Sequence, residues 1–377
     1  MLLSLTSDQE FFRETTAKFL TELTPVADLR RRRHDPDGFD ADYWRRGAEL
    51  GWTSLLVEEA SGGGSISGKG ILDLSLVAYE FGAHASPGPL IPSNVVAGTL
   101  SATGSHPEVL AAIVSGKGIA TWALGEAPPS DRFREIALEI RQDGDTLVLN
   151  GTKRPVESAS KADYLLVTGN TGGGLSQVLI PTATAGVTIA RMRTVDLTRR
   201  FDLVTFTDVR VPIHALVGEL GYAANAVDQQ LRHAVVMLNA ESVGAMQTAF
   251  DMTVQWAFDR YSFGRPLASY QALKHRFAEM LVSLECSHAI SDDAAEAVAD
   301  SSEGADELLS AAKAFIGKFG GELMQECVQL HGGIGLTFEH DIHLYFRRHT
   351  LNQSLYGTAA EHRRRITDLI EQDEARS

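Results

Sequence analysis

The chain has 377 residues, of which 44% are hydrophobic and 22% are charged, a composition typical of soluble globular proteins with two or three layers or domains. Its 34 Lys and Arg residues and 49 Asp and Glu residues give a formal net charge of −15 at pH 7. This charge repels nucleic acid and anionic membranes, so we expect neither as a partner. Any anionic ligand then requires a local cluster of arginines.

The two cysteines, Cys286 and Cys327, lie in helical context without the spacing of a zinc or disulfide motif, so we expect buried thiols in a reducing cytosol. The N-terminal segment MLLSLTSDQEFFRETT lacks the basic start and the small-residue cleavage site of a secretion signal. No apolar run approaches the roughly 20 residues that span a bilayer. We therefore expect a cytoplasmic protein.

Three regions follow one another along the chain. In residues 1–117 the apolar spacing is that of amphipathic helices, as in DQEFFRETTAKFLTEL. In residues 118–220, short alternating runs such as ALEIRQDGDTLVLNG and FDLVTFTDVRVP predict antiparallel strands. In residues 221–377 long helical patterns return. This order predicts an α+β fold with an N-terminal helical domain, a middle antiparallel β domain and a C-terminal helical bundle.

Two glycine-containing interruptions divide the helical patterns of the last region. The first is DRYSFGRPLASYQALKH, residues 259–275, and the second is QLHGGIGLTFEHDIHLYFRR, which begins at Gln329. A helix interrupted by glycine exposes backbone N–H groups that can hold a phosphate oxygen. Arg260 and Arg265 would add charge-assisted hydrogen bonds to a diphosphate, and Phe263 offers an apolar face to an aromatic ring.

The same segments also have a purely structural interpretation. Gly332 or Gly333 can end a helix as a C-cap while the arginines face solvent, and the residues alone leave both interpretations open. His331, His340 and His343 lie close in sequence, but no carboxylate or Cys at ligand spacing accompanies them. We therefore expect no metal site.

The segments RYSFGRPLASYQALKHRFAEM, QLHGGIGLTFEHD and YGTAAEHRR together resemble the acyl-CoA dehydrogenase family. The resemblance covers nearly the whole chain, because GWTSLLVEEASGGG is similar to the N-terminal helical domain of that family and FDLVTFTDVRVPIHALVG to its middle strands. It implies FAD as the cofactor, held across a subunit interface by residues of the two corners and of the C-terminal turn. These residues are Arg260, Phe263, Gln271, Gln329, Gly332, Gly333 and Thr358.

The resemblance also implies a reaction. In such proteins a Glu removes the α-proton of an acyl-CoA thioester while the β-hydride passes to the flavin, which leaves a 2-enoyl-CoA. Hydrogen bonds to the thioester carbonyl make the α-proton acidic enough, and a desolvated carboxylate is then a sufficient base. An electron-transfer flavoprotein is the expected electron acceptor, and the expected assembly is a tetramer.

The usual bases of that family are absent from this sequence. One common Glu position is occupied by Tyr356, which is neutral at pH 7, and the other is occupied by Ala234. Val235 replaces an Arg that usually contacts the substrate. Glu241 and Glu339 are weak candidates for a displaced base, although either can be an ordinary interhelical or surface charge. The catalytic residue therefore stays unknown at this point.

The segments that resemble the flavin-ring contacts are altered as well. Gly125 stands where a hydroxyl residue commonly bonds the flavin, and Pro155 and Glu157 stand where a Trp and a Ser or Thr are usual. A carboxylate near the flavin disfavours the anionic reduced form. These losses favour one half of a heteromeric enzyme, of the kind known for actinobacterial steroid side chains, in which a paralogous partner supplies the base. The alternatives are a homotetramer with a displaced base and a catalytically silent scaffold.

Overall fold

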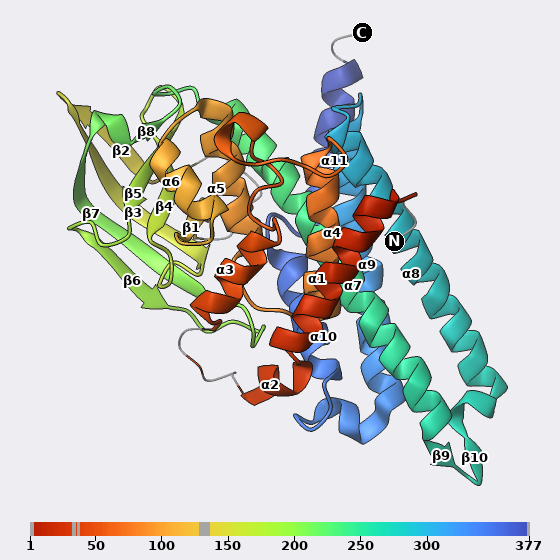
Figure 1. The fold of residues 1–377 in the computed structure, drawn as a ribbon. Helices are drawn as coiled ribbons and strands as arrows, with labels where there is room; N and C mark the ends of the chain where they lie inside the picture. The colour runs from red at the N-terminus through yellow and green to blue at the C-terminus, as the bar shows by residue number, and fades with distance from the viewer. Residues whose placement is uncertain (1–3, 32–34, 36–37, 128–135, 375–377) are drawn as a thin grey trace.

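The computed structural model describes residues 4–31, 35, 38–127 and 136–374. A β-sheet domain lies beside two helical regions that pack against one another (Figure 1). The N-terminal region contains the helices α1 (Ser7–Leu23), α2 (Val26–Arg31), α3 (Ala41–Glu49), α4 (Gly70–Ala83), α5 (Leu90–Thr103) and α6 (Pro107–Val114). Its core includes the fully buried rings of Trp44, Trp52 and Phe81.

Within the described residues, eight strands form one sheet. The strands are β1 (Ala120–Ala123), β2 (Glu139–Asp143), β3 (Thr146–Glu157), β4 (Tyr164–Asn170), β5 (Leu175–Pro181), β6 (Val187–Arg191), β7 (Phe201–Pro212) and β8 (Leu216–Val217). Their order is β6-β7-β3-β2-β4-β5-β8, with β1 paired to β4. The strand pairs are mostly antiparallel, as the alternating runs predict. The exceptions are β1 and β2, which both run parallel to β4.

The C-terminal bundle consists of α7 (Ala224–Asp259), α8 (Gln271–Ala299), α9 (Ala305–His331), α10 (Ile342–Ser354) and α11 (Ala359–Glu374). Both predicted interruptions are present. A short hairpin of β9 (Tyr261–Ser262) and β10 (Arg265–Pro266) separates α7 from α8, and the 3-10 helix η5 (Gly332–Leu336) follows α9. Figure 1 shows the hairpin at the end of α7 and α8 that lies away from the sheet.

Helices α4 and α7 join the two helical regions through a close backbone approach. A Cβ atom at Gly82 would lie 1.8 Å from the carbonyl oxygen of Glu241, and a Cβ atom at Gly244 would lie 2.0 Å from that of Tyr79. Both distances are far inside van der Waals contact, so each position requires glycine. The N-terminal domain is therefore fixed to the middle of α7.

The expectation of two buried thiols is wrong for one of them. Cys327 on α9 is buried, but Cys286 is exposed on the outer face of α8. Helical periodicity alone does not tell which face of a long helix another element covers. No helix among the described residues is both long and apolar enough to cross a membrane. The part of the chain that the structure describes also contains no group of three His, Cys, Asp or Glu side chains placed to hold a metal ion.

Candidate functional site

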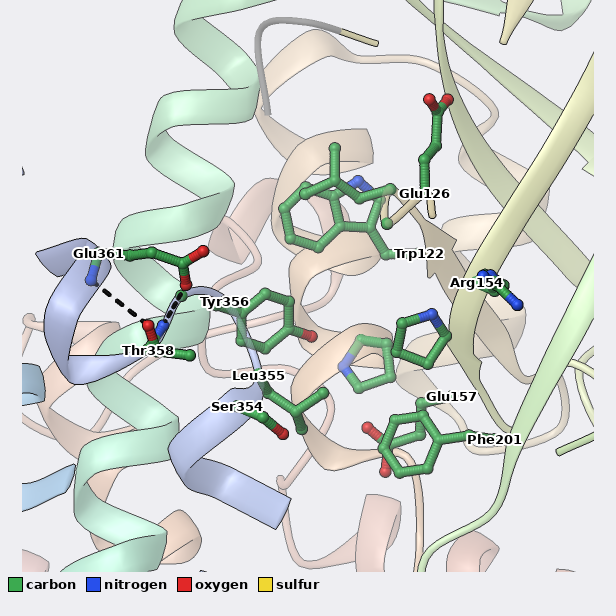
Figure 2. Close-up of a pocket in the computed structure, with 15 residues that line it drawn as sticks. Trp122, Glu126, Arg154, Glu157, Phe201, Ser354, Leu355, Tyr356, Thr358 and Glu361 are labelled. Atoms are coloured by element: carbon green, nitrogen blue, oxygen red, sulfur yellow. Dashed lines mark hydrogen bonds between the residues drawn. The ribbon is translucent and has the colours of Figure 1, made fainter. Parts of the chain in front are cut away.

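A cavity of about 390 Å³ lies where the sheet meets the turn between α10 and α11 (Figure 2). Its lining comes from α5, β1 and the segment after it, β3, β7, the end of α10, that turn and the start of α11. The lining residues are Pro92, Trp122, Leu124, Gly125, Glu126, Arg154, Pro155, Glu157, Phe201, Ser354, Leu355, Tyr356, Gly357, Thr358 and Glu361. Gly125, Pro155 and Glu157, the positions that differ from the usual flavin-ring contacts, therefore line the cavity. Tyr356, at one of the two usual positions of the base, lines it as well.

Tyr356 forms one wall of the cavity. Its ring lies nearly parallel to that of Trp122, at an angle of 22° with the centroids 6.0 Å apart. Its backbone has a φ of 55°, in the left-handed region, and its carbonyl oxygen is 3.0 Å from Nε2 of His362. Burial, and then the nearby Glu157 carboxylate, raises the pKa of the Tyr356 phenol above its ordinary value. The phenol is therefore neutral over the whole physiological pH range.

Three carboxylates line the cavity, and each already accepts hydrogen bonds from the chain itself. Glu126 accepts from Lys153 Nζ at 2.7 Å and from two backbone N–H groups. Although burial raises it, the pKa of the Glu126 carboxyl is held below its ordinary value by Lys153 and these N–H groups. Glu361 caps α11, because its Oε2 accepts from the backbone N of Thr358 at 2.6 Å.

The third carboxylate, Glu157, is paired to a buried arginine. Both its oxygens accept hydrogen bonds from Arg199, one of them from Nε at 2.7 Å. Burial raises the pKa of the Glu157 carboxyl, although the Arg199 guanidinium opposes this shift. Proton transfer to this carboxylate would disrupt a buried ion pair, so it is poorly suited to act as a base.

The altered position Gly125 leaves little room for a side chain. A Cβ atom there would lie 3.0 Å from the carbonyl oxygen of Arg154, and the carbonyl oxygen of Gly125 accepts from the backbone N of Arg154 at 2.8 Å. Lys153 Nζ donates a hydrogen bond to the neighbouring carbonyl oxygen of Leu124 at 2.9 Å. Polar backbone groups along this strand end are therefore used within the chain.

A buried network of charges joins the cavity to the helices. Arg199 donates to Glu241 Oε2 at 3.0 Å and to Asn352 Oδ1 at 3.1 Å, in addition to Glu157. Arg348 donates to the other Glu241 oxygen, Oε1, at 2.8 Å. Asn352 also donates to Glu241 Oε2, at 2.9 Å. Both oxygens of Glu241 are thus held by donors, and Glu241 does not line the cavity.

Arg348 is the centre of this network. Its side chain is fully buried and contacts three parts of the chain: the Asp196 carboxylate before β7, Glu241 on α7, and the backbone oxygens of Ala85 and Ser86 after α4. The network therefore links the N-terminal helices, the sheet domain and the bundle. No local sequence signal identified it, since Arg348 and Asp196 are 152 positions apart.

Two other predicted base positions, Ala234 and Glu339, do not line the cavity. Ala234 is completely buried within α7. Glu339 is exposed in the segment between η5 and α10, where its carbonyl oxygen accepts a hydrogen bond from Arg30. Of the sequence-predicted positions for a base, only Tyr356 is brought to the cavity.

The structure brings the two interrupted corners together at one end of the bundle. The ring of Trp256, one turn before the first corner, stacks on that of His331, which directly precedes the second, with centroids 5.5 Å apart. The six predicted cofactor residues of these corners are all exposed: Arg260, Phe263, Gln271, Gln329, Gly332 and Gly333. Thr358 lies apart from them, at the cavity.

Phe263 is the most exposed large apolar residue of the described chain, at 97%. It has a φ of 51° at the tip of the hairpin, and Leu336, in the second corner, is 81% exposed. A Cβ atom added at Gly332 or Gly333 would meet nothing within 4 Å. The guanidinium of Arg265, by contrast, lies 3.8 Å above the ring of Tyr270. The corners thus present an open backbone and an uncovered aromatic ring.

Comparison with known proteins identifies the family. The family model described as acyl-CoA dehydrogenase, N-terminal domain, matches residues 6–116, and the one described as acyl-CoA dehydrogenase, C-terminal domain, matches residues 223–370. The chain belongs to the acyl-CoA dehydrogenase family. The acyl-CoA dehydrogenase IpdE2 of Mycolicibacterium smegmatis is 28% identical over 364 residues, covering 96% of this chain and 98% of the relative.

Solved structures of acyl-CoA dehydrogenases show the same fold. A Tcur3481-Tcur3483 steroid ACAD variant superposes with a TM-score of 0.87 at 27% identity, covering 97% of this chain and 98% of that one. The ChsE4-ChsE5 complex of Mycobacterium tuberculosis gives a TM-score of 0.88 at 23% identity, covering 98% and 99%. The α+β fold predicted from the sequence is therefore confirmed, with the helical, sheet and helical regions in the order of this family.

Proposed function

We propose that this chain is one subunit of a heteromeric, FAD-dependent acyl-CoA dehydrogenase, in which a related chain supplies the catalytic base and the flavin-ring contacts. The observation that carries the proposal is that the cavity contains no carboxylate free to act as a base. Each described carboxylate in its lining is already bonded within the chain, and the position of the usual base is a neutral phenol.

The corners fit the ADP half of FAD. Arg260 is exposed and offers a guanidinium to a diphosphate, and the ring of Phe263 is free to pack on an aromatic base. Gly332 and Gly333 allow the backbone to approach a phosphate without a side chain between them. Because these groups face outward at the end of the bundle, the FAD that they hold belongs to another subunit.

The cavity does not fit the flavin ring in the manner usual for the family. Gly125 carries no hydroxyl, Pro155 has no N–H to donate, and the Glu157 carboxylate adds a negative charge that Arg199 already pairs. Bound FAD supplies the hydride acceptor for oxidation of the α,β bond. This chain's own contribution is to hold that cofactor for its partner.

We further propose that the substrate is an acyl-CoA with a steroid-derived acyl part and that an electron-transfer flavoprotein takes the electrons. The substrate class is supported by the steroid ACAD among the similar structures, and the acceptor by analogy with the family. The exposed apolar corner also indicates an assembly of at least two subunits, and we propose a tetramer. A monomeric mass by light scattering at micromolar concentration, for the chain with its partner, would contradict this assembly.

The decisive experiment is a count of FAD. The chain is expressed alone and together with a paralogous acyl-CoA dehydrogenase, and bound flavin is measured by absorbance and native mass spectrometry. We expect the chain alone to purify without FAD and the complex to hold one FAD per pair of different chains. One FAD per chain, or a yellow and active single chain, would establish a homo-oligomeric enzyme instead.

The competing assignment is a homotetramer with Glu241 as the displaced base, and it has its own test. Since general-base contributions are about 10²- to 10⁴-fold, Glu241→Gln in the complex should then cost about 10³-fold in dehydrogenation. We expect a change of a few-fold, because the two oxygens of Glu241 are held by Arg199, Arg348 and Asn352 away from the cavity.

A further inference from the structure

We infer that Arg30 on α2 is a positioning residue for the second corner, because it holds the end of the loop on which the glycines of that corner lie. This loop, residues 332–341, joins α9 to α10 and is called the corner loop below. For its effect on FAD the inference rests on the proposed function and deepens it, since it adds a residue of the N-terminal region to a site formed by the bundle. The contacts of Arg30 themselves do not depend on FAD.

The first half of the corner loop is open to solvent. Gly332 has a φ of 66°, a Cβ atom at Gly332 or Gly333 would meet nothing within 4 Å, and Leu336 is 81% exposed. Hydrogen bonds within the loop are local, as between Thr337 Oγ1 and the carbonyl oxygen of Ile334 at 2.8 Å. Glycine loses more conformational freedom on ordering than any other residue. The position of the loop therefore depends on how its two ends are held.

The end of the corner loop next to α9 is held within the bundle. His331, directly before Gly332, is buried, and its Nδ1 donates to the carbonyl oxygen of Cys327 at 2.7 Å. The His331 ring also stacks on that of Trp256 of α7, at an angle of 21° with the centroids 5.5 Å apart. This end therefore follows the position of α7 and α9.

The other end of the corner loop is held by the N-terminal region. Arg30 Nη1 donates to the carbonyl oxygen of Phe338 at 3.2 Å and to that of Glu339. Arg30 Nε lies 2.7 Å from Oδ1 of Asp341 and forms an ion pair with it. Two carbonyl oxygens and a carboxylate of the loop thus meet one guanidinium. Figure 1 shows α2 beside this end of the loop.

Arginine is suited to this position by its chemistry and by its support. A guanidinium carries five N–H donors in a planar fork, so it can serve several oxygens at once. The side chains of Arg30 and Asp341 are 30% and 26% exposed, so solvent screens this pair less than a fully exposed one. Leu29, the preceding residue, is buried in the hydrophobic core and anchors α2. Arg30 therefore ties the corner loop to the core of the N-terminal region.

Phe338 also attaches this end of the loop to α10. Its ring meets the ring of His343 edge-on, with the centroids 4.9 Å apart, and the guanidinium of Arg347 lies 5.4 Å above it. Both partners belong to the bundle, so these contacts remain when Arg30 is replaced. The expected effect of replacing Arg30 is therefore a looser corner loop in a folded chain.

The first test needs no cofactor. Hydrogen–deuterium exchange of residues 332–341 is followed by mass spectrometry in the full-length chain. We expect exchange in Arg30→Ala to be roughly tenfold faster, the contribution of one hydrogen bond to a charged group. Arg31→Ala is the matched control and should not change exchange, because Arg31 is exposed and pairs with Asp28 of its own helix. Unchanged exchange in Arg30→Ala would overturn the inference.

The second test measures the release of FAD from the proposed heteromer. Arg30→Ala should release FAD several-fold faster, because a ligand is held less tightly when the conformation that binds it is less populated. Arg30→Lys should lie between Arg30→Ala and the unaltered chain, since lysine keeps the charge beside Asp341 but lacks the planar fork. Arg31→Ala should again have no effect. Thermal melts show that each variant is folded.

Arg260→Ala separates failure of this inference from failure of the proposed function. If Arg260→Ala speeds the release of FAD and Arg30→Ala does not, the corners hold FAD but Arg30 does not position them, and the inference is wrong. If neither variant changes the release of FAD, the proposed role of the corners is wrong, and the inferred effect of Arg30 on FAD is wrong with it. Faster release in both variants supports the inference.

Discussion

The exposed corners and the buried cavity of this member of the acyl-CoA dehydrogenase family differ in how their polar groups are used. At the corners, Arg260 and Phe263 face outward and the glycines leave the backbone uncovered. At the cavity, Glu126 and Glu157 are paired to cations of the same chain. A group that is already satisfied within its own subunit contributes to stability, whereas an exposed and uncommitted group is available to a ligand or a partner. Substitutions in the buried network should therefore change mainly the unfolding free energy, whereas substitutions at the corners should change mainly the retention of FAD.

The largest effect on stability is expected at the centre of the buried network. Arg348→Met removes the cation that pairs with Asp196 and Glu241 and leaves buried charge uncompensated. Breaking such a pair costs about 3 to 5 kcal/mol of unfolding free energy, which urea denaturation of the full chain measures. Arg45→Ala is the control, because its pairs with Asp42 and Glu49 lie on the surface and should contribute at most about 1 kcal/mol. Equal losses of unfolding free energy in Arg348→Met and Arg45→Ala would contradict a special contribution of the buried network to stability.

The corresponding effect on cofactor retention is expected at the corner. Arg260→Ala removes the proposed charge-assisted contact with the diphosphate, which would be worth about 1.5 to 3 kcal/mol, so FAD should dissociate from the heteromer at least about tenfold more readily. The unfolding free energy should change by less than about 0.5 kcal/mol, because Arg260 is exposed. Arg265→Ala serves as the comparison variant, since its guanidinium lies 3.8 Å from the ring centroid of Tyr270, whereas that of Arg260 lies 6.0 Å from the ring centroid of Trp256. Full FAD occupancy of Arg260→Ala after dialysis would leave the corner with a structural role only.

A smaller, pH-dependent effect is expected from Lys313. Burial lowers the pKa of its ammonium group from 10.5 to about 7, and Nζ donates to the carbonyl oxygen of Asn352. Between about pH 7 and 10.5 the unfolded chain therefore binds more protons than the folded one. The unfolding free energy should rise with pH in this window, by at most about 1.4 kcal/mol per pH unit. Lys313→Met should remove this part of the slope when denaturation is followed at pH 7, 8 and 9, whereas the exposed Lys274→Met should not.

The smallest effect is expected from restoring the usual residue type at the cavity. Tyr356→Glu places a carboxylate at the common base position but leaves Gly125, Pro155 and Glu157 unchanged. We expect little or no acyl-CoA dehydrogenation by the single chain, measured with an artificial electron acceptor. Substantial turnover would show that the cavity lacks only the base. The cavity could then, like the corners, take part in the reaction.

Local signals predicted the fold and the corners well. Gly264 lies in the turn of the hairpin between α7 and α8, and Gly332 directly follows α9; both have positive φ angles, so the interruptions could be predicted from the sequence. The charge network could not be predicted in this way. Arg199 lies in the segment between β6 and β7 and Glu241 lies on α7, so they are brought together only by the tertiary fold. Nothing local distinguishes Arg348 from its half-exposed neighbour Arg347. The exposed Cys286 was missed for the same reason, since burial on a long helix depends on what packs against it.

Helix α7 sets the distance between the two regions. Glu241 and Arg260 are joined by continuous helix, and at 1.5 Å per residue they are separated by about 28 Å along its axis. One residue inserted into the exposed half of α7 would advance the hairpin by only about 1.5 Å but would turn it by about 100° around the axis. The corner that we propose holds FAD would then face a different direction while the cavity stayed intact. In the proposed heteromer, the length of this helix would therefore set the relative orientation of the two subunits that share FAD.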